Sequence, residues 1–140
     1  MLTPWYITGF CEGEAAFTYS RAGGTFALYF SIKQKEESRE ILAAIQEYFG
    51  YIGKIYGHSP AQSSAYYRVT KIQELKRVVG HFDKYPLQSK KKNEAYRVWR
   101  QMVMHKIEHY RGIDYEKLRT LAEKLSGLNA RSRAFQVHKR

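Results

Sequence analysis

Two acidic residues, Glu12 and Glu14, stand at the end of a short segment that is predicted to be helical. Thr3 is a good N-cap residue, and Pro4 suits the first helical position because its missing N–H would have no partner there. Carboxylates at the C-terminal end of a helix meet the negative end of its dipole, which disfavours them by about 0.3–1 kcal/mol each. We therefore expect these carboxylates to have a functional role. Clustered carboxylates suit the binding of a hard cation such as Mg²⁺ or Ca²⁺.

Two glycines, Gly9 and Gly13, lie four residues apart in the same segment. Each costs a helix up to about 1 kcal/mol relative to alanine, but together they clear one helix face so that another backbone can approach. The segment occurs once, so we expect its partner to be the same helix of a second subunit across a two-fold axis. The expected interface residues are Tyr6, Gly9, Phe10 and Gly13. The alternative is that the glycines pack against a strand of their own chain and that the carboxylates are solvated at a frayed helix end.

Residues 7–15, with the sequence ITGFCEGEA, resemble the nine-residue motif of the LAGLIDADG homing endonucleases. The chain departs from the common form at Glu12, where aspartate is usual, and at Ala15, where glycine is usual. The resemblance implies that Glu14 and the backbone of Ala15 bind the catalytic metal. The implied ion is Mg²⁺, with Ca²⁺ as a substitute that does not support cleavage and Mn²⁺ as a further candidate.

Two further residues are candidates through the same resemblance. Residues 86–91 match a Pro-Leu-x-Thr/Ser-Lys-Lys segment of the family, whose second lysine, here Lys91, reaches the active site. Gln34 falls where the family has a polar residue that orders water. The resemblance thus implies catalytic roles for Glu14, Lys91 and Gln34. Taken alone, the lysine run indicates only a solvated surface or contacts with phosphates.

The composition indicates a polyanionic partner. The 140 residues include 24 Lys and Arg against 13 Asp and Glu, which gives a net charge of +11. An excess of this size favours DNA or RNA, because contacts with phosphates dominate nucleic-acid affinity. No apolar run is long enough to span a membrane and no signal peptide is recognisable, so we expect a soluble chain with no membrane partner. The single cysteine, Cys11, is expected to be a small buried apolar residue.

The order of predicted elements gives the fold class. A helix over residues 3–14 is followed by strand, strand, helix, strand, strand and helix, and Gly23-Gly24 marks the first hairpin turn. We predict an α+β protein with the αββαββα LAGLIDADG fold, a four-stranded antiparallel sheet with helices on one face, and two added C-terminal helices. The domain is expected to span residues 1–129, with its C-terminal helices within 91–129 and a basic tail at 130–140. The expected strands are 16–22, 25–35, 51–58 and 64–70, and the later helices are 37–48, 72–82, 94–110 and 114–125.

Alternation along the strands leaves one face of the sheet for DNA. Phe26, Leu28, Phe30 and Ile32 are expected to face the core, so their neighbours face outward. A sheet face with hydroxyl, basic and aromatic groups suits the major groove, although a solvated face would look the same. The predicted DNA-binding residues are Thr18, Ser20, Tyr29, Ser31, Lys33, Lys35, Lys54, Tyr56, His58, Tyr66, Arg68, Thr70 and, beyond the sheet, Lys90.

These features together predict a site-specific homing endonuclease, a homodimer that makes a metal-dependent double-strand cut in a long pseudo-palindromic DNA site. The alternative on the same fold is an RNA-splicing maturase or a DNA-binding module without cleavage, and in the first case RNA is a partner. A protein that coats nucleic acid without sequence preference is a further alternative. We expect an organelle-encoded protein of a mitochondrion or chloroplast, and otherwise an intracellular protein of a prokaryote.

Overall fold

The computed structural model describes residues 1–57 and 63–130. His58 and the basic tail over residues 131–140 therefore lie outside the described part. The elements are α1 (Pro4–Glu14), β1 (Ala15–Ala22), β2 (Thr25–Lys35), the 3₁₀ turn η1 (Glu36–Ser38), α2 (Arg39–Tyr48), β3 (Lys54–Tyr56), β4 (Ser64–Val69), α3 (Ile72–Lys84), α4 (Lys90–Glu108) and α5 (Tyr115–Asn129).

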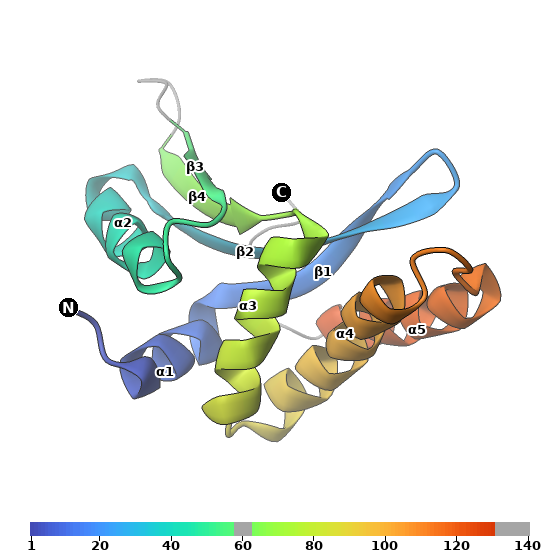
Figure 1. Ribbon diagram of the computed structural model, residues 1–140. Helices are drawn as coiled ribbons and strands as arrows, with labels where there is room; N and C mark the ends of the chain where they lie inside the picture. The colour runs from blue at the N-terminus through green and yellow to red at the C-terminus, as the bar shows by residue number, and fades with distance from the viewer. Residues whose placement is uncertain (58–62, 131–140) are drawn as a thin grey trace.

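The four strands form one antiparallel sheet in the order β1-β2-β4-β3. Gly23 and Gly24 both have positive φ, as the tight turn between β1 and β2 requires. The helices pack on one side of the sheet, with α3 crossing in front of the central strands in Figure 1. The predicted fold class, element order and two added C-terminal helices are confirmed.

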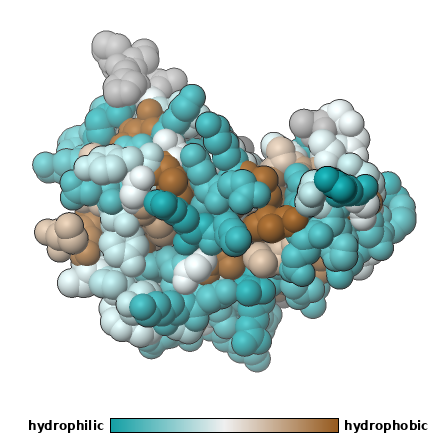
Figure 2. Space-filling model, viewed as in Figure 1, coloured by the Kyte–Doolittle hydropathy of each residue, from teal (hydrophilic) through white to brown (hydrophobic). Residues whose placement is uncertain are grey.

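The core lies between the sheet and the helices. Phe17 of β1 is its aromatic centre, with ring centroids 5.2–5.4 Å from those of Phe30, Phe82, Tyr96 and Trp99. The Trp99 indole Nε1 donates to the Thr18 carbonyl at 3.1 Å, so this large ring joins α4 to β1. The inward face of β2 predicted from alternation is buried. The outer surface of the helical layer is mainly hydrophilic, with limited hydrophobic areas between the helices (Figure 2).

Helix α1 begins as its sequence predicts. The Thr3 hydroxyl accepts a hydrogen bond from the Tyr6 backbone N–H at 3.3 Å, and Pro4 occupies the first turn. Ile7, Thr8 and Cys11 form the buried side of the helix. Burial raises the pKa of the Cys11 thiol, which makes it an unreactive core residue as predicted.

The start of α4, the extent of β3 and the end of α5 differ most from the prediction, and α5 ends at Asn129, four residues after the predicted Leu125. Helix α4 begins at Lys90, four residues before the predicted start at Glu94, so the lysine run forms its first turn. Strand β3 covers only Lys54–Tyr56, because the flanking residues Gly53 and Gly57 have positive φ, which an extended strand does not adopt. Within the described residues, none of the helices has the length and apolar content needed to cross a membrane.

Candidate functional site

The carboxyl end of α1 passes directly into β1, with Glu14 as the last helical residue and Ala15 as the first residue of the strand. The Ala15 N–H closes the helix by donating to the Cys11 carbonyl. Because no loop intervenes, the Glu14 carboxylate and the Ala15 carbonyl are held by two packed elements. The helix end is therefore a rigid position for these two oxygen-bearing groups.

Gln34, near the end of β2, lies beside Glu14. Its amide Nε2 donates to Glu14 Oε2 at 3.2 Å and to the Lys33 carbonyl at 2.9 Å. Ala15 pairs with Ile32 across the sheet, which brings the end of β2 next to the end of α1. Two of the three predicted catalytic residues are thus brought together.

The lysine that reaches this point is Lys92, not Lys91. The Lys92 ammonium donates to the Ala15 carbonyl, whereas Lys91 is exposed and the structure does not bring it to Glu14. Burial lowers the pKa of Lys92, and the nearby Glu12 and Glu14 carboxylates oppose that shift. The sequence pattern does not distinguish the two lysines, because Lys91 lies one helical turn before the buried Ala95 and Lys92 one turn before the buried Tyr96.

Glu12 explains why α4 begins earlier than predicted. Its carboxylate accepts hydrogen bonds from the backbone N–H of Gln88 at 2.7 Å and of Ser89 at 3.1 Å, and from the Ser89 hydroxyl at 2.7 Å. These N–H groups stand at the start of α4, where a helix lacks internal acceptors and favours negative charge. Glu12 therefore fixes the first turn of α4, and with it Lys92, to the end of α1.

The oxygen donors at this point fit a hard cation. A carboxylate from Glu14 and a backbone carbonyl from Ala15 are ligand types that Mg²⁺ and Ca²⁺ accept. The Ala15 carbonyl also accepts from the Lys92 ammonium, so a cation bound there would share this oxygen with Lys92. Across residues 1–57 and 63–130, no group of three or more His, Cys, Asp or Glu side chains is placed to hold a metal. One chain thus offers two oxygen ligands.

The outer face of α1 carries the four residues predicted to form a dimer interface. A Cβ atom built at Gly9 or Gly13 would meet nothing within 4 Å, so neither glycine packs against a strand or helix of the described residues. The alternative in which they contact a strand of the same chain is therefore wrong. Tyr6 is 45% exposed, and its ring stacks on that of the partly buried Phe10 with centroids 6.1 Å apart. The described residues therefore leave this face of α1 uncovered at Gly9 and Gly13.

A buried hydrogen-bond network holds the opposite side of α1. The Thr8 hydroxyl donates to the Tyr85 carbonyl at 2.8 Å, so it accepts from His81 Nε2, which lies 2.9 Å away. His81 Nδ1 then accepts from the Tyr48 hydroxyl at 2.8 Å. Burial lowers the pKa of His81 to about 4, so the ring is neutral at pH 7. The network joins α1 to α2 and α3, and sequence patterns gave no sign of it.

Most predicted DNA-binding residues lie on the side of the sheet away from the helices, here called the open face. Arg68 pairs with both Ser31 and Lys54, and Tyr66 pairs with both Lys33 and Tyr56. Residues of the open face that are exposed or half-buried are Ser20, Tyr29, Lys33, Lys35, Lys54, Tyr56, Tyr66 and Arg68, and Thr70 follows the end of β4. Lys90 is exposed at the start of α4, away from these strands along the chain.

Two of the predicted contact residues are not accessible as expected. Thr18 is 6% exposed and Ser31 is fully buried, although both alternate with core residues. Their short side chains lie beside the larger Tyr29 and Arg68, which are their cross-strand partners. The sequence pattern predicted the correct face of the sheet for these two small residues but not that their side chains are buried.

A model of the LAGLIDADG endonuclease family matches residues 7–103, which include most of α1, the sheet, α2, α3 and most of α4. The chain belongs to the LAGLIDADG endonuclease family. The probable intron-encoded endonuclease 2 of Neurospora crassa is 31% identical over 139 residues, covering 91% of this chain and 29% of that protein. An uncharacterised 50.9 kDa protein in ND4 intron 1 of Podospora anserina is 33% identical over 102 residues, covering 66% of this chain and 22% of that protein. The LAGLIDADG chain spans about a quarter of the length of the curated relatives it matches.

Solved structures show the same fold. The LAGLIDADG meganuclease I-AabMI, bound to uncleaved DNA, is 28% identical with a TM-score of 0.75, over 94% of this chain and 45% of that chain. The archaeal intron-encoded homing endonuclease I-Vdi141I, complexed with DNA, is 26% identical with a TM-score of 0.75, over 89% of this chain and 82% of that chain. Helix α1 is the LAGLIDADG motif helix. Ala15, where the motif usually has glycine, has φ −90° and ψ 150°, which alanine adopts without strain.

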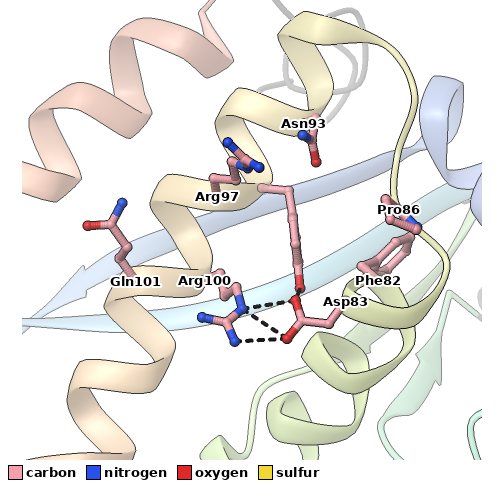
Figure 3. Close-up of a pocket in the computed structure, with 8 residues that line it drawn as sticks. Phe82, Asp83, Pro86, Asn93, Arg97, Arg100 and Gln101 are labelled. Carbon is pink, nitrogen blue, oxygen red and sulfur yellow. Dashed lines mark hydrogen bonds and ion pairs between the residues drawn. The ribbon is translucent and has the colours of Figure 1, made fainter.

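A hollow of about 390 Å³ lies apart from the LAGLIDADG motif, between the end of α3 and α4 (Figure 3). The Asp83 carboxylate, which lines this hollow, already accepts hydrogen bonds from Arg100 at 2.8 Å and from the Tyr96 hydroxyl at 2.8 Å. Partial burial raises the pKa of Asp83, but these hydrogen bonds outweigh that effect and lower it. The hollow therefore contains the interaction that joins α3 to α4, and it adds no acid or base to the site at Glu14.

Proposed function

We propose that this LAGLIDADG protein is a homodimeric homing endonuclease that makes a Mg²⁺-dependent double-strand cut at a long pseudo-palindromic DNA site. One observation carries the proposal. Glu14, Gln34 and Lys92 converge at the end of a helix whose glycine face is uncovered. A second α1 on that face would bring two such ends together.

Each residue at the helix end has a distinct role in this proposal. Glu14 and the Ala15 carbonyl would hold the divalent ion, which would supply the activation of a water and the stabilisation of the leaving oxygen. Gln34 fixes the orientation of the Glu14 carboxylate through its 3.2 Å hydrogen bond and presents its amide to a water. The Lys92 ammonium stabilises the negative charge that develops on the phosphate, the role first assigned to Lys91.

Pairing of two α1 helices would make the protein two-fold symmetric, and this symmetry would determine the symmetry of the DNA site that it recognises. The uncovered Gly9 and Gly13 permit a close approach of two backbones, with Tyr6 and Phe10 beside the contact. Each chain then delivers one Glu14 to one strand of the duplex, and a two-fold protein matches a site with two related halves. The net charge of +11 and the basic residues of the open face support DNA as the ligand.

The names of the relatives support an organelle as the place where the protein acts. The curated relatives include fungal proteins named for an intron or as probable intron-encoded endonucleases. We propose that the protein acts in an organelle, in the first place a mitochondrion, on DNA that lacks the intron encoding it. The substrate is then the junction of the two flanking exons.

A cleavage assay on that junction tests the proposal. The wild-type protein with Mg²⁺ is expected to linearise a plasmid carrying the intronless exon junction and to leave a plasmid without it intact. Glu14→Gln is expected to bind the junction with similar affinity and not to cut it. Glu123→Gln is the matched control, because Glu123 is exposed on α5, and it should cut like the wild type.

Other outcomes separate the alternatives. Wild-type protein that binds the junction without cutting in Mg²⁺ or Mn²⁺ would support the non-cleaving DNA-binding module. Binding of the intron RNA with assistance to its splicing and no DNA cleavage would support the maturase. Salt-sensitive binding of all sequences alike would support a coating protein. Cleavage by Glu14→Gln would show that another residue binds the metal.

A further inference from the structure

Arg68 occupies the middle of the open face. It lies on β4, an inner strand of the sheet, where it pairs with Ser31 of β2 on one side and with Lys54 of β3 on the other. The outward positions of the described strands carry hydroxyl, aromatic and basic side chains and no carboxylate. Arg68 and Lys54 are therefore like charges directly opposite each other, which is unfavourable until an anionic or acceptor-rich ligand arrives.

Two tyrosines fix the position of the Arg68 guanidinium. Its central carbon lies 4.8 Å from the centroid of the Tyr29 ring and 5.6 Å from that of the Tyr66 ring. Such contacts attract a guanidinium to the ring faces and limit the rotamers it can adopt. A planar side chain held in this way loses less entropy on binding than a mobile one.

Among residues 1–57 and 63–130, the structure shows no hydrogen bond donated by the Arg68 side chain. Its Nε is buried without a partner, and so is the Oγ of the paired Ser31. Three arginines of the described residues form ion pairs, Arg39 with Glu36, Arg100 with Asp83 and Arg119 with Glu116, whereas the structure gives Arg68 no ion pair. A buried donor without an acceptor lowers the stability of the free chain. We therefore infer that the packing around Arg68 favours the binding of a ligand that supplies an acceptor.

A guanidinium at this place matches one base edge better than others. Guanine presents the acceptors O6 and N7 side by side in the major groove, and the arginine fork binds both at once. Phosphates lie along the rims of the groove, so a side chain at the centre of a sheet face inserted there meets bases first. The exposed Lys35 and Lys54 flank this centre and suit phosphate contacts.

We propose that Arg68 binds a guanine in each half of the DNA site and that Tyr29 is the positioning residue that holds its guanidinium for this contact. This inference rests on the proposed function, because it needs a duplex in contact with the open face. In a two-fold dimer, the two Arg68 residues contact guanines on opposite strands at equal distances from the centre of the site.

Selection from a pool of randomised duplexes tests the inference. The full chain is used with Ca²⁺ in place of Mg²⁺, and the bound duplexes of wild type and variants are sequenced. The wild type is expected to select one symmetric pair of guanines whose replacement by adenine raises the Kd about tenfold or more. Arg68→Lys keeps the charge but not the fork, so this ratio should fall to about twofold or less with other positions unchanged.

Matched variants distinguish a specific contact from a general disturbance. Arg97→Lys makes the same change on the exposed surface of α4 and should leave every preference unchanged. Tyr29→Leu should weaken the guanine preference although Arg68 is present, whereas Tyr29→Phe should keep it. Circular dichroism of each variant checks its fold.

Two results would overturn the inference in distinguishable ways. A wild-type protein that selects a defined sequence, with Arg68→Lys and Tyr29→Leu selecting the same one, would refute the role of Arg68 and leave the proposed function standing. A wild-type protein that selects no sequence at all would refute both.

Discussion

The carboxylate of Glu12 should stabilise the fold by capping α4 from a distant part of the chain. Replacing it in Glu12→Gln keeps the shape but removes the charge that accepts from Gln88 N–H, Ser89 N–H and the Ser89 hydroxyl at 2.7–3.1 Å. Hydrogen bonds to a charged group contribute about 1.5–3 kcal/mol, and the helix dipole adds about 0.3–1 kcal/mol. The Gln amide oxygen can still accept some of these hydrogen bonds and so retains part of the stabilisation. We therefore expect the free energy of unfolding to fall by about 1–2 kcal/mol.

Urea unfolding at a fixed protein concentration measures this loss. The midpoint should fall while the slope with urea stays unchanged, because the surface exposed on unfolding is the same. In thermal unfolding the loss should lower Tm by about 3 °C for each kcal/mol. Glu123→Gln, an exposed change on α5, should stay within about 0.5 kcal/mol of the wild type. A Glu12→Gln protein as stable as Glu123→Gln would refute the capping role.

Three further predictions follow from the geometry. Lys92→Met should lower the cleavage rate by about 10²–10³-fold with DNA binding retained, whereas Lys91→Met should cut at nearly the wild-type rate; equal loss in both would contradict the assignment. Gly9→Leu should yield a folded monomer by light scattering, because its side chain meets nothing in its own chain but blocks a second helix, while Gly127→Leu on α5 should remain dimeric. His81 should titrate near pH 4 by NMR, because burial lowers its pKa from 6.5. The folded state then binds fewer protons than the unfolded state, so the free energy of unfolding should fall by about 2 kcal/mol between pH 6.5 and 4 and change little from this group below that; a pKa near 6.5 would contradict its burial.

Local signals predicted the parts of the fold that local forces determine. The Thr3 cap, the Gly23-Gly24 turn and the alternation along β2 each act within a few residues, and each is as expected. The start of α4 is different, because its cap is Glu12, 77 residues before Ser89 in the chain. No pattern within residues 85–94 contains that information.

The candidate site likewise contains residues that the sequence predicts and residues whose positions depend on tertiary packing. The resemblance to the LAGLIDADG family points to both Glu14 and Gln34, and the structure brings them together. The choice between Lys91 and Lys92 depends on the rotation of α4 about its axis, which is set by the packing of α4 on the sheet, including the hydrogen bond from Trp99 to the Thr18 carbonyl. The buried depth of Ser31 depends on its large neighbours, and a strand pattern gives only the direction of a side chain.

A mixed dimer of one wild-type chain and one Glu14→Gln chain, purified with two different tags, tests most directly whether each chain cuts one strand. On a supercoiled plasmid with the exon junction and Mg²⁺, the mixed dimer should produce nicked circles, while the wild-type dimer produces linear DNA and the Glu14→Gln dimer neither. Linear DNA from the mixed dimer at the wild-type rate would contradict the pairing of two α1 ends with one Glu14 for each strand.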